Sequence, residues 1–332
     1  MFFSIIIPIF NRPDELDELL QSLTLQNFDT KNIHFEVIII EDGSTNKADI
    51  ICQKYQNQLN SKLDIKYFYK ENTGQGFSRN VGFEKAGGDY FIVFDSDCII
   101  PPNYLQTVYN FLQANYLDAF GGSDAAHQSF TPVQKAISYA MTSLFSTGGI
   151  RGNKNSAEKF RPRSFNMGIS RKVWETTKGY KITRMGEDIE FSIRIEKVGF
   201  KTGLIAEAFV YHKRRTDFSQ FYKQLHFFGR GRINIRHFFP EELKLVHTFP
   251  VCFVLYLCLS PFILIFSVKL CLVHFLSILF YFSVIFFDAL RKTKNIKVAF
   301  LSIFAVFIQL SAYGIGFLKE SLTLVFNTKN KK

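Results

Sequence analysis

Cysteine is scarce in this chain of 332 residues, and the familiar nucleotide fingerprints are missing from it. The five cysteines show no CxxC or other metal-ligand spacing, and three of them lie in apolar runs. A zinc ribbon and a disulfide framework are therefore not expected, and the soluble part is predicted to face a reducing compartment. The glycine-rich stretch 74–80 has Arg79 where a dinucleotide fingerprint needs its third glycine, and no GxxxxGK[ST] occurs. The sequence thus supports neither a Rossmann dehydrogenase nor a P-loop.

Acidic residues are also outnumbered, with 29 Asp and Glu against 40 Lys and Arg. Between Tyr211 and Lys244 there are eight basic and three acidic residues, just before the apolar C-terminal third. A basic segment in this position is attracted to the anionic cytoplasmic leaflet by about 1 kcal/mol per residue. We therefore expect contact with a membrane surface and no nucleic-acid partner, since binding driven by charge would require a basic face on the soluble domain.

Long uncharged runs occur late in the chain, at 249–268, 270–287 and 298–318. Each is long enough to cross a hydrocarbon core of about 30 Å, and three of them in eighty residues disfavour a buried hairpin of a soluble protein. Because the connection at 291–297 is basic, the positive-inside rule predicts a hairpin out and back from a cytoplasmic N-terminal domain. The third run spans the membrane, which would place the basic tail outside, or it lies in the interface or re-enters. Residues 1–10 lack a basic n-region, so no cleavable signal peptide is expected.

The first 120 residues alternate between strand-length apolar runs and segments with helical spacing. Strands are predicted at 2–7, 35–40, 65–69 and 90–94, and helices at 13–25, 47–59, 76–85 and 103–115. This alternation predicts an α/β fold with a mostly parallel sheet covered by helices on both sides. Ligands of such sheets bind beyond the carboxyl ends of the strands, so the site is expected in the loops after Ile9, Ile40 and Phe94.

Acidic residues follow two of the predicted strands. Asp42, after the second strand, either accepts a hydrogen bond from a base or ribose or forms a turn or helix cap. Asp95 and Asp97 follow the fourth strand. Two such carboxylates repel each other unless a cation joins them, which favours a divalent metal carrying a diphosphate over a solvated turn.

Four further candidates have two interpretations each. Glu187 and Asp188 begin a predicted amphipathic helix, where carboxylates are favoured by the helix dipole or serve as a catalytic base. Arg79 is either a surface ion-pair partner or a cation near the nucleotide. His212 ends the apolar run 204–211 and is either structural or a metal ligand.

Five ordered motifs, covering roughly residues 3–212, resemble those of the inverting glycosyltransferases of family 2, which have the GT-A fold. The motifs are SIIIPIFNR, EVIIIEDGS, GFSRNVGFEKAGGDYFIVFDSD, FNMGISR and GEDIEFSIR.

The resemblance assigns a role to each candidate residue. It implies that Pro8, Asn11 and Asp42 line the nucleoside pocket, with Asp42 on the base. Arg79 and Asp95 would contact the nucleotide, while Asp97 and His212 would hold Mn²⁺ or Mg²⁺ on the diphosphate. Asp188 would be the catalytic base, with Glu187 in support.

We therefore expect a membrane-anchored inverting glycosyltransferase that works on the cytoplasmic face in surface polysaccharide or glycolipid assembly. Its donor would be a nucleotide-diphospho-sugar, with a UDP-sugar favoured, and its acceptor a lipid-linked or glycan hydroxyl. The processive synthases of the family carry QxxRW, whereas the one tryptophan here is Trp174, so transfer of a single sugar is expected. The alternative is a catalytically silent, membrane-anchored protein that binds nucleotide-sugars or organises other enzymes, which need not keep Asp95, Asp97 and Asp188.

The expected domains are a GT-A domain at 1–245, hydrophobic helices at 246–320 and a basic tail at 321–332. Within the GT-A domain, residues 211–245 are predicted to be a basic amphipathic segment at the membrane interface. Its stripe of Phe218, Phe221, Tyr222, Leu225 and Phe228 either faces the membrane interface or packs on the catalytic domain. The basic stretch 151–163 either covers a phosphorylated lipid acceptor or is a solvated loop.

Overall fold

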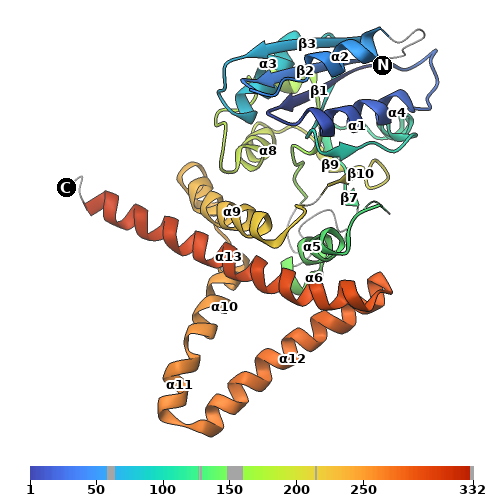
Figure 1. Ribbon diagram of the computed structural model, residues 1–332. Helices are drawn as coiled ribbons and strands as arrows, with labels where there is room; N and C mark the ends of the chain where they lie inside the picture. Colours follow the sequence, from blue (N-terminus) through green and yellow to red (C-terminus); the bar gives the residue numbers. More distant parts are fainter. Residues whose placement is uncertain (58–63, 126, 128, 148–159, 214, 330–332) are drawn as a thin grey trace. The chain divides into compact units, whose positions relative to one another are not determined.

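The chain forms two compact units. The computed structural model describes residues 1–57, 64–125, 127, 129–147, 160–213 and 215–329, the last five as helical backbone alone (Figure 1). The first unit consists of Met1–His127 and Arg151–Lys213, and the second of Gln128–Ile150 and Arg214–Lys332. These units differ from the predicted domains, because the division falls at 213 rather than at 245 and a stretch after 127 joins the C-terminal helices.

The first unit is built on a seven-stranded sheet. In spatial order its strands are β3 (Asp64–Lys70), β2 (His34–Asp42), β1 (Phe2–Ile9), β4 (Tyr90–Phe94), β8 (Asn166–Ser170), β6 (Ala119–Gly121) and β9 (Thr202–Leu204). The first four run parallel, and β8 is antiparallel to both of its neighbours. The predicted mostly parallel α/β sheet is thus confirmed.

Helices cover both faces of this sheet, as their shared core shows. The predicted helices are α1 (Pro13–Thr24), α2 (Asp49–Gln56), α3 (Gln75–Lys85) and α4 (Tyr104–Ala114), and residues 58–59 of the second prediction lie outside the described residues. Ile5 and Ile7 of β1 pack with residues of α1, α2 and α4, whereas Ile6 packs on the other face with Phe83 of α3. Both faces of the strand are therefore buried, which explains its unbroken apolar sequence.

Three smaller elements complete the site end of this unit. A short sheet has the order β5 (Cys98–Ile99), β10 (Val210–His212), β7 (Asp124–Ala125), and His212 lies opposite Cys98 in it. Helix α7 (Arg171–Thr177) follows β8. Helix α8 (Glu187–Lys197) begins after Gly186, whose φ of 98° favours glycine. These connections bring the residues around 187 and 212 to the sheet from far along the chain.

The second unit consists of helices. They are α5 (Pro132–Thr142), α6 (Leu144–Thr147), α9 (Phe218–Phe238), the short 3₁₀ turns η1 (Pro240–Glu242) and η2 (Leu245–Thr248), α10 (Phe249–Cys258), α11 (Ser260–Phe266), α12 (Val268–Thr293) and α13 (Ile296–Lys329). Helices α5, α9, α10 and α12 all contact α13. In Figure 1, α10 and α11 descend to a turn, α12 returns, and α13 crosses the open ends of this hairpin.

The aromatic stripe of α9 is packed in the core of this second unit. Phe221 and Leu225 are buried in one cluster with side chains of α5 and α13, and Phe218 and Phe228 pack against that cluster. Tyr222 remains 38% exposed. The core interpretation therefore holds for most of the stripe, but its partners are α5 and α13 rather than the catalytic domain. This packing is also why the observed division of the chain precedes α9.

Glycines set the close approach of the helices to α13. A Cβ atom added at Gly229 of α9 would collide with the backbone of Tyr313, and one at Gly316 with the backbone of His226. Gly314 meets the backbone of Pro250 in α10 in the same way. The glycines that make the third apolar run less hydrophobic are therefore the positions where α9 and α10 cross it, since only small residues let helix backbones come so near.

Among the residues that the structure describes, two helices are long and apolar enough to cross a membrane, α12 (Val268–Thr293) and the Ile296–Leu324 part of α13. The segment Leu245–Cys258 and helix α11 are long and apolar enough when they are taken together, but they are bent by 42° relative to each other. Pro261, which has no N–H to donate, lies in the first turn of α11. An apolar stretch of 18 residues is 11% buried in α12 and 50% buried in α13, so the two helices differ in how much apolar surface they expose.

Candidate active site

The carboxyl ends of β1 and β2 are tied together by Asn11. Its side-chain Oδ1 accepts hydrogen bonds of 2.9 Å from the backbone N–H groups of Thr45 and Asn46, and its own N–H donates to Ser44 Oγ at 2.8 Å. Pro8 lies in β1 beside Ile40 of β2. These two of the three predicted nucleoside-pocket residues therefore lie at the expected edge of the sheet, and their role there remains a prediction.

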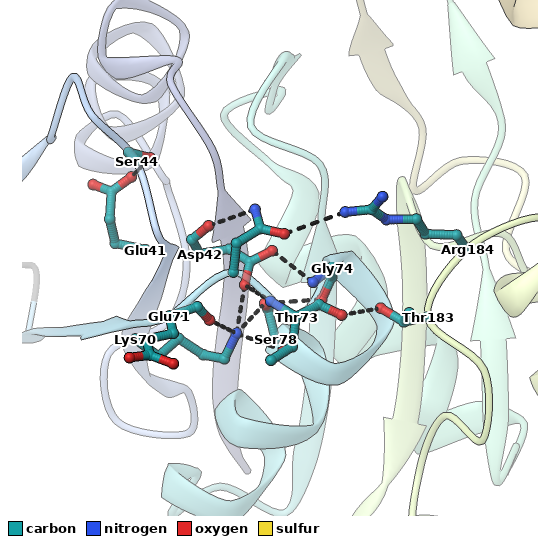
Figure 2. Close-up of polar contacts among 11 residues, drawn as sticks. Glu41, Asp42, Ser44, Lys70, Glu71, Thr73, Gly74, Ser78, Thr183 and Arg184 are labelled. Carbon is teal, nitrogen blue, oxygen red and sulfur yellow. Dashed lines mark hydrogen bonds and ion pairs between the residues drawn. The ribbon is translucent and has the colours of Figure 1, made fainter.

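Asp42 organises the loop that follows β3 (Figure 2). Its carboxylate accepts hydrogen bonds from Lys70 and from the backbone N–H groups of Thr73 and Gly74, the last two at 2.9 Å. Burial alone would raise the pKa of Asp42, but these hydrogen bonds outweigh it and lower the pKa below 3.8. Asp42 is thus a charged anchor for the loop, and any contact with a base would be additional to these bonds.

The same loop is held from its other side by the segment before α8. Thr183 Oγ1 donates to the carbonyl of Thr73 at 2.9 Å, and Arg184 Nη2 donates to Asn72 Oδ1 at 3.2 Å. Figure 2 shows Thr183 and Arg184 facing the loop from a separate part of the chain. The loop between β3 and α3 is therefore fixed at both sides.

Arg79 joins two of the predicted acidic positions. Its side chain is 1% exposed, its Nη2 lies 2.8 Å from Asp95 Oδ1 and its Nη1 lies 3.3 Å from Glu187 Oε1. Gln75 Nε2 also donates to Glu187. The interpretation of Arg79 as a surface ion-pair partner is therefore wrong, because its guanidinium group is buried. Such burial also speaks against the predicted direct contact of Arg79 with the nucleotide, and instead makes it a positioning residue for Asp95 and Glu187.

Asp97 and His212 come together as predicted. The distance from His212 Nε2 to Asp97 Oδ1 is 3.0 Å, and the Phe165 ring stacks on the imidazole with centroids 5.0 Å apart. Arg12, whose role the sequence did not suggest, places Nη1 3.1 Å from Asp97 Oδ2. The missed signal was its position after β1, since neighbouring parallel strands end at the same edge.

Cys98 belongs to the same group. Asp97, Cys98 and His212 offer donor atoms that all lie within 4.8 Å of one another. A carboxylate and an imidazole at this separation fit a divalent cation. Burial, followed by the charges of Asp97 and Asp95, raises the pKa of the Cys98 thiol.

Asp188 lies in the first turn of α8 and is not buried. Its side chain is 22% exposed, Oδ1 accepts a 2.8 Å hydrogen bond from the Ile189 N–H, and Oδ2 lies 3.7 Å from Arg163 Nη1. Arg163 was predicted as the end of a basic loop, of which 151–159 lie outside the described residues. Because Glu187 is bonded to Arg79 and Arg79 to Asp95, the start of α8 is held at the exit of β4.

Glu187 differs from Asp188 in its surroundings. Its side chain is 5% exposed, and burial, followed by the adjacent charge of Asp188, raises its pKa above the ordinary value of 4.5. Glu187 is therefore a buried structural carboxylate, whereas Asp188 keeps access to solvent.

Comparison with known proteins identifies the first unit. The family model described as "Glycosyl transferase family 2" matches residues 4–176, which is more than half of the chain. The chain belongs to glycosyltransferase family 2. Most of the site of this family 2 protein, from Pro8 to Asp97, lies within the matched residues, while Glu187, Asp188 and His212 lie beyond them.

Two bacterial relatives illustrate the match. The poly(ribitol-phosphate) beta-N-acetylglucosaminyltransferase TarS of Staphylococcus aureus is 34% identical over 118 residues, which are 36% of this chain and 20% of TarS. The minor teichoic acid biosynthesis protein GgaB of Bacillus subtilis is 26% identical over 217 residues, which are 65% of this chain and 23% of GgaB. The family 2 chain thus spans about a fifth to a quarter of the length of these relatives.

A solved structure extends the likeness to the whole fold. The mannosyltransferase PcManGT from Pyrobaculum calidifontis, in complex with GDP-Man and Mn²⁺, has a TM-score of 0.60 and 12% sequence identity over 95% of this chain and 86% of its own. At this identity the comparison speaks for the fold alone. The family 2 chain has the GT-A fold, followed by helices long and apolar enough to span a membrane.

Proposed function

We propose that this chain is an inverting, metal-dependent glycosyltransferase that moves a single sugar from a nucleotide-diphospho-sugar, with a UDP-sugar favoured, to a hydroxyl of a lipid-linked or glycan acceptor. One observation carries the proposal. Arg79 connects Asp95 at the end of β4 with Glu187 at the start of α8, so the carboxylates of both motifs converge on one edge of the sheet. A catalytically silent binding protein would not need this convergence.

The residues divide the chemistry between them. Asp188, half-buried at the start of α8, removes the proton from the acceptor hydroxyl as the hydroxyl oxygen attacks the anomeric carbon. Attack from the side opposite the diphosphate inverts the configuration. Asp97 and His212 would hold Mn²⁺ or Mg²⁺, which stabilises the negative charge of the departing diphosphate. Pro8, Asn11, Asp42 and Asp95 line the nucleotide side.

The names of the two relatives favour a cell-surface polymer as the context. TarS is named for poly(ribitol-phosphate) and GgaB for teichoic acid, and both are similar to this chain in part of their length. The acceptor of the present chain would accordingly be a glycan or a lipid-linked precursor made at the cytoplasmic membrane.

The direct test is a screen of UDP-, GDP- and dTDP-sugars against the purified full-length protein with and without Mn²⁺. We expect Mn²⁺-stimulated release of the nucleotide from one donor class, with water as the slow acceptor. Binding of a donor without any release under these conditions would favour the silent binding protein instead.

Asp97→Ala is expected to weaken Mn²⁺-dependent binding of that nucleotide at least about tenfold, because a loss of about 1.4 kcal/mol already corresponds to this factor. Isothermal titration with the free nucleotide measures it. The control Asp64→Ala removes a carboxylate whose side chain is 64% exposed and should leave the affinity unchanged. Equal affinities for the wild type and Asp97→Ala would remove Asp97 from the set of metal ligands.

The membrane contact proposed here is a hairpin of α10, α11 and α12, with α13 lying along the membrane surface. Helix α9, which packs along α13, carries Lys223, Arg230, Arg232 and Arg236. Each such charge costs about 2.5–3.5 kcal/mol or more at the centre of a bilayer, so α9 and the face of α13 that it covers stay out of the hydrocarbon. An ion pair of 2.7 Å between Arg230 and Glu320 joins the two helices.

The cytoplasmic end of the hairpin is marked by Asp288 in α12. Asp288 Oδ2 accepts hydrogen bonds of 2.8 Å from the hydroxyl of Tyr139 in α5 and from Nζ of Lys292. The part of α12 before Asp288 contains 20 residues, about 30 Å of helix, which matches the hydrocarbon thickness. Lys269 at the turn would then reach the far surface.

A hairpin that crosses the membrane out and back places the C-terminal tail on the same side of the membrane as the catalytic unit. Lys269→Cys is expected to react with a membrane-impermeant maleimide in intact cells, whereas Lys332→Cys is expected to react only after the cells are permeabilised. The unsubstituted chain reports labelling of the native cysteines. Labelling of Lys332→Cys in intact cells would show that α13 crosses the membrane.

A further inference from the structure

The metal-binding group contains a thiol that the proposed function does not use. Cys98 directly follows Asp97 in the chain and lies opposite His212 in the antiparallel pair of β5 and β10. Side chains of directly opposed residues point to the same face of a sheet. The donor atom of Asp97 also lies near this pair, since those of Asp97, Cys98 and His212 are all within 4.8 Å of one another.

These side chains contact Arg12, one another and a backbone carbonyl oxygen. Arg12 engages Oδ2 of Asp97, while Oδ1 faces His212 Nε2 at 3.0 Å. The Cys98 Sγ makes a long contact of 3.5 Å with the carbonyl oxygen of Phe165, the residue whose ring stacks on His212. A thiol–carbonyl hydrogen bond is weak, so its replacement by a metal bond costs little.

Oxygen, sulfur and nitrogen donors in one group select metals differently from oxygen donors alone. Mg²⁺ and Mn²⁺ prefer carboxylates, water and phosphates, whereas thiolate and imidazole suit Zn²⁺ and its analogue Co²⁺. In a tetrahedral zinc site with ligand bonds of about 2.0–2.3 Å, the donors lie roughly 3.5 Å apart. Donor separations that now range from 3.0 Å, between Asp97 and His212, up to 4.8 Å would therefore have to change by about 1 Å at most.

We infer that Cys98 gives the site a second metal-binding mode, in which Zn²⁺ or Co²⁺ takes Asp97, Cys98 and His212 as three protein ligands. The thiol releases its proton to solvent when the metal binds, as metal–thiolate formation requires. Mn²⁺ and Mg²⁺ use Asp97 and His212 without Cys98. This inference rests on the proposed function for those two ligands and adds what the neighbouring thiol does.

The consequence is selective inhibition by thiophilic metals. A cation held by three protein ligands in tetrahedral geometry keeps one open position, whereas an octahedral ion keeps several for diphosphate oxygens and water. Zn²⁺ therefore displaces Mn²⁺ from the site and lowers the metal-dependent activity, and Cys98 sets how strongly it does so.

Cobalt provides a readout that does not depend on activity. Titration of the full-length protein with Co²⁺, without nucleotide, is expected to produce a thiolate-to-cobalt charge-transfer band in the near ultraviolet. The band should disappear in Cys98→Ser and persist in Cys52→Ser, which changes the other buried cysteine of this unit. Circular dichroism and the thermal unfolding midpoint report whether each variant is folded, and Cys98→Ala replaces Cys98→Ser if the latter is not.

Competition with a chromogenic chelator then measures the affinities. We expect Zn²⁺ to bind the wild type at least about tenfold more tightly than the folded Cys98 variant, with Mn²⁺ affinity equal within about twofold. Co²⁺ binding without the charge-transfer band, or equal Zn²⁺ affinities, would overturn the inference. In that case Mn²⁺-stimulated donor hydrolysis would still stand as an independent test of the proposed function.

Discussion

Replacing Asp188 with asparagine is expected to lower the turnover of sugar transfer by about 10²–10⁴-fold, the usual contribution of a general base. The amide has nearly the same shape, and its oxygen can keep the 2.8 Å hydrogen bond from the Ile189 N–H, so the start of α8 is preserved. It cannot accept a proton from the acceptor. The affinity for nucleotide should change by less than about twofold, because the contacts of Arg79 with Asp95 and Glu187 are untouched.

Initial rates of nucleotide release from the donor found in the screen, together with titration of the free nucleotide, measure the two effects separately. Asp49→Asn is the matched control, because Asp49 also lies in the first turn of a helix and accepts a 3.0 Å hydrogen bond from the next N–H, that of Ile50. It should leave turnover unchanged. Retained turnover in Asp188→Asn would place the base elsewhere, and an equal loss of nucleotide affinity would make Asp188 a binding residue.

Much of the fold was predictable because buried parallel strands have a simple signature. Strands β1, β2 and β4 are buried on both faces, whereas the edge strand β3 is only partly buried, and all four were predicted within three residues of their observed ends. The antiparallel strand β8 was not predicted. Its sequence, NMGIS, contains one β-branched residue, and its place between β4 and β6 depends on contacts far apart in the chain.

The site was predictable in its residue types but not in its pairings. The pattern of strand ends indicated Asp95 and Asp97, the start of a predicted helix indicated Asp188 and the end of an apolar run indicated His212, and the resemblance then assigned their roles. Arg12, Arg163 and Cys98 were missed as their neighbours, since these contacts arise only when separate loops fold together. The stripe of α9 shows the same limit, because helical spacing indicates which face is apolar and not which helix covers it.

Replacing Arg79 with methionine is expected to lower the free energy of unfolding by about 3–5 kcal/mol, the usual cost of removing one partner of a buried ion pair. Asp95 is 33% exposed in its side chain and can be hydrated, but Glu187 is 5% exposed and would lose its cation. The expected loss therefore arises mainly from Glu187. Thermal unfolding of the full-length protein in detergent, followed by the near-ultraviolet signal, measures it.

The loss should depend on pH in a defined direction. Burial and the neighbouring Asp188 already raise the pKa of Glu187 above 4.5, and removing Arg79 raises it further. A carboxyl whose pKa is higher in the folded than in the unfolded state binds more protons when folded, so stability falls as pH rises from about 4.5 through the folded pKa. Arg79→Met should thus be closer to the wild type at pH 5 than at pH 8.

Two further variants decide whether the buried charge is the cause. Adding Glu187→Gln to Arg79→Met should recover most of the lost stability and remove the added pH dependence, because a neutral amide needs no counter-ion. Lys54→Met breaks the exposed pair with Asp17, whose side chains are 52% and 38% exposed, and should cost less than about 1 kcal/mol. If Arg79→Met cost no more than Lys54→Met, or if Glu187→Gln gave no recovery, Arg79 would not be the residue that holds α8 to the exit of β4.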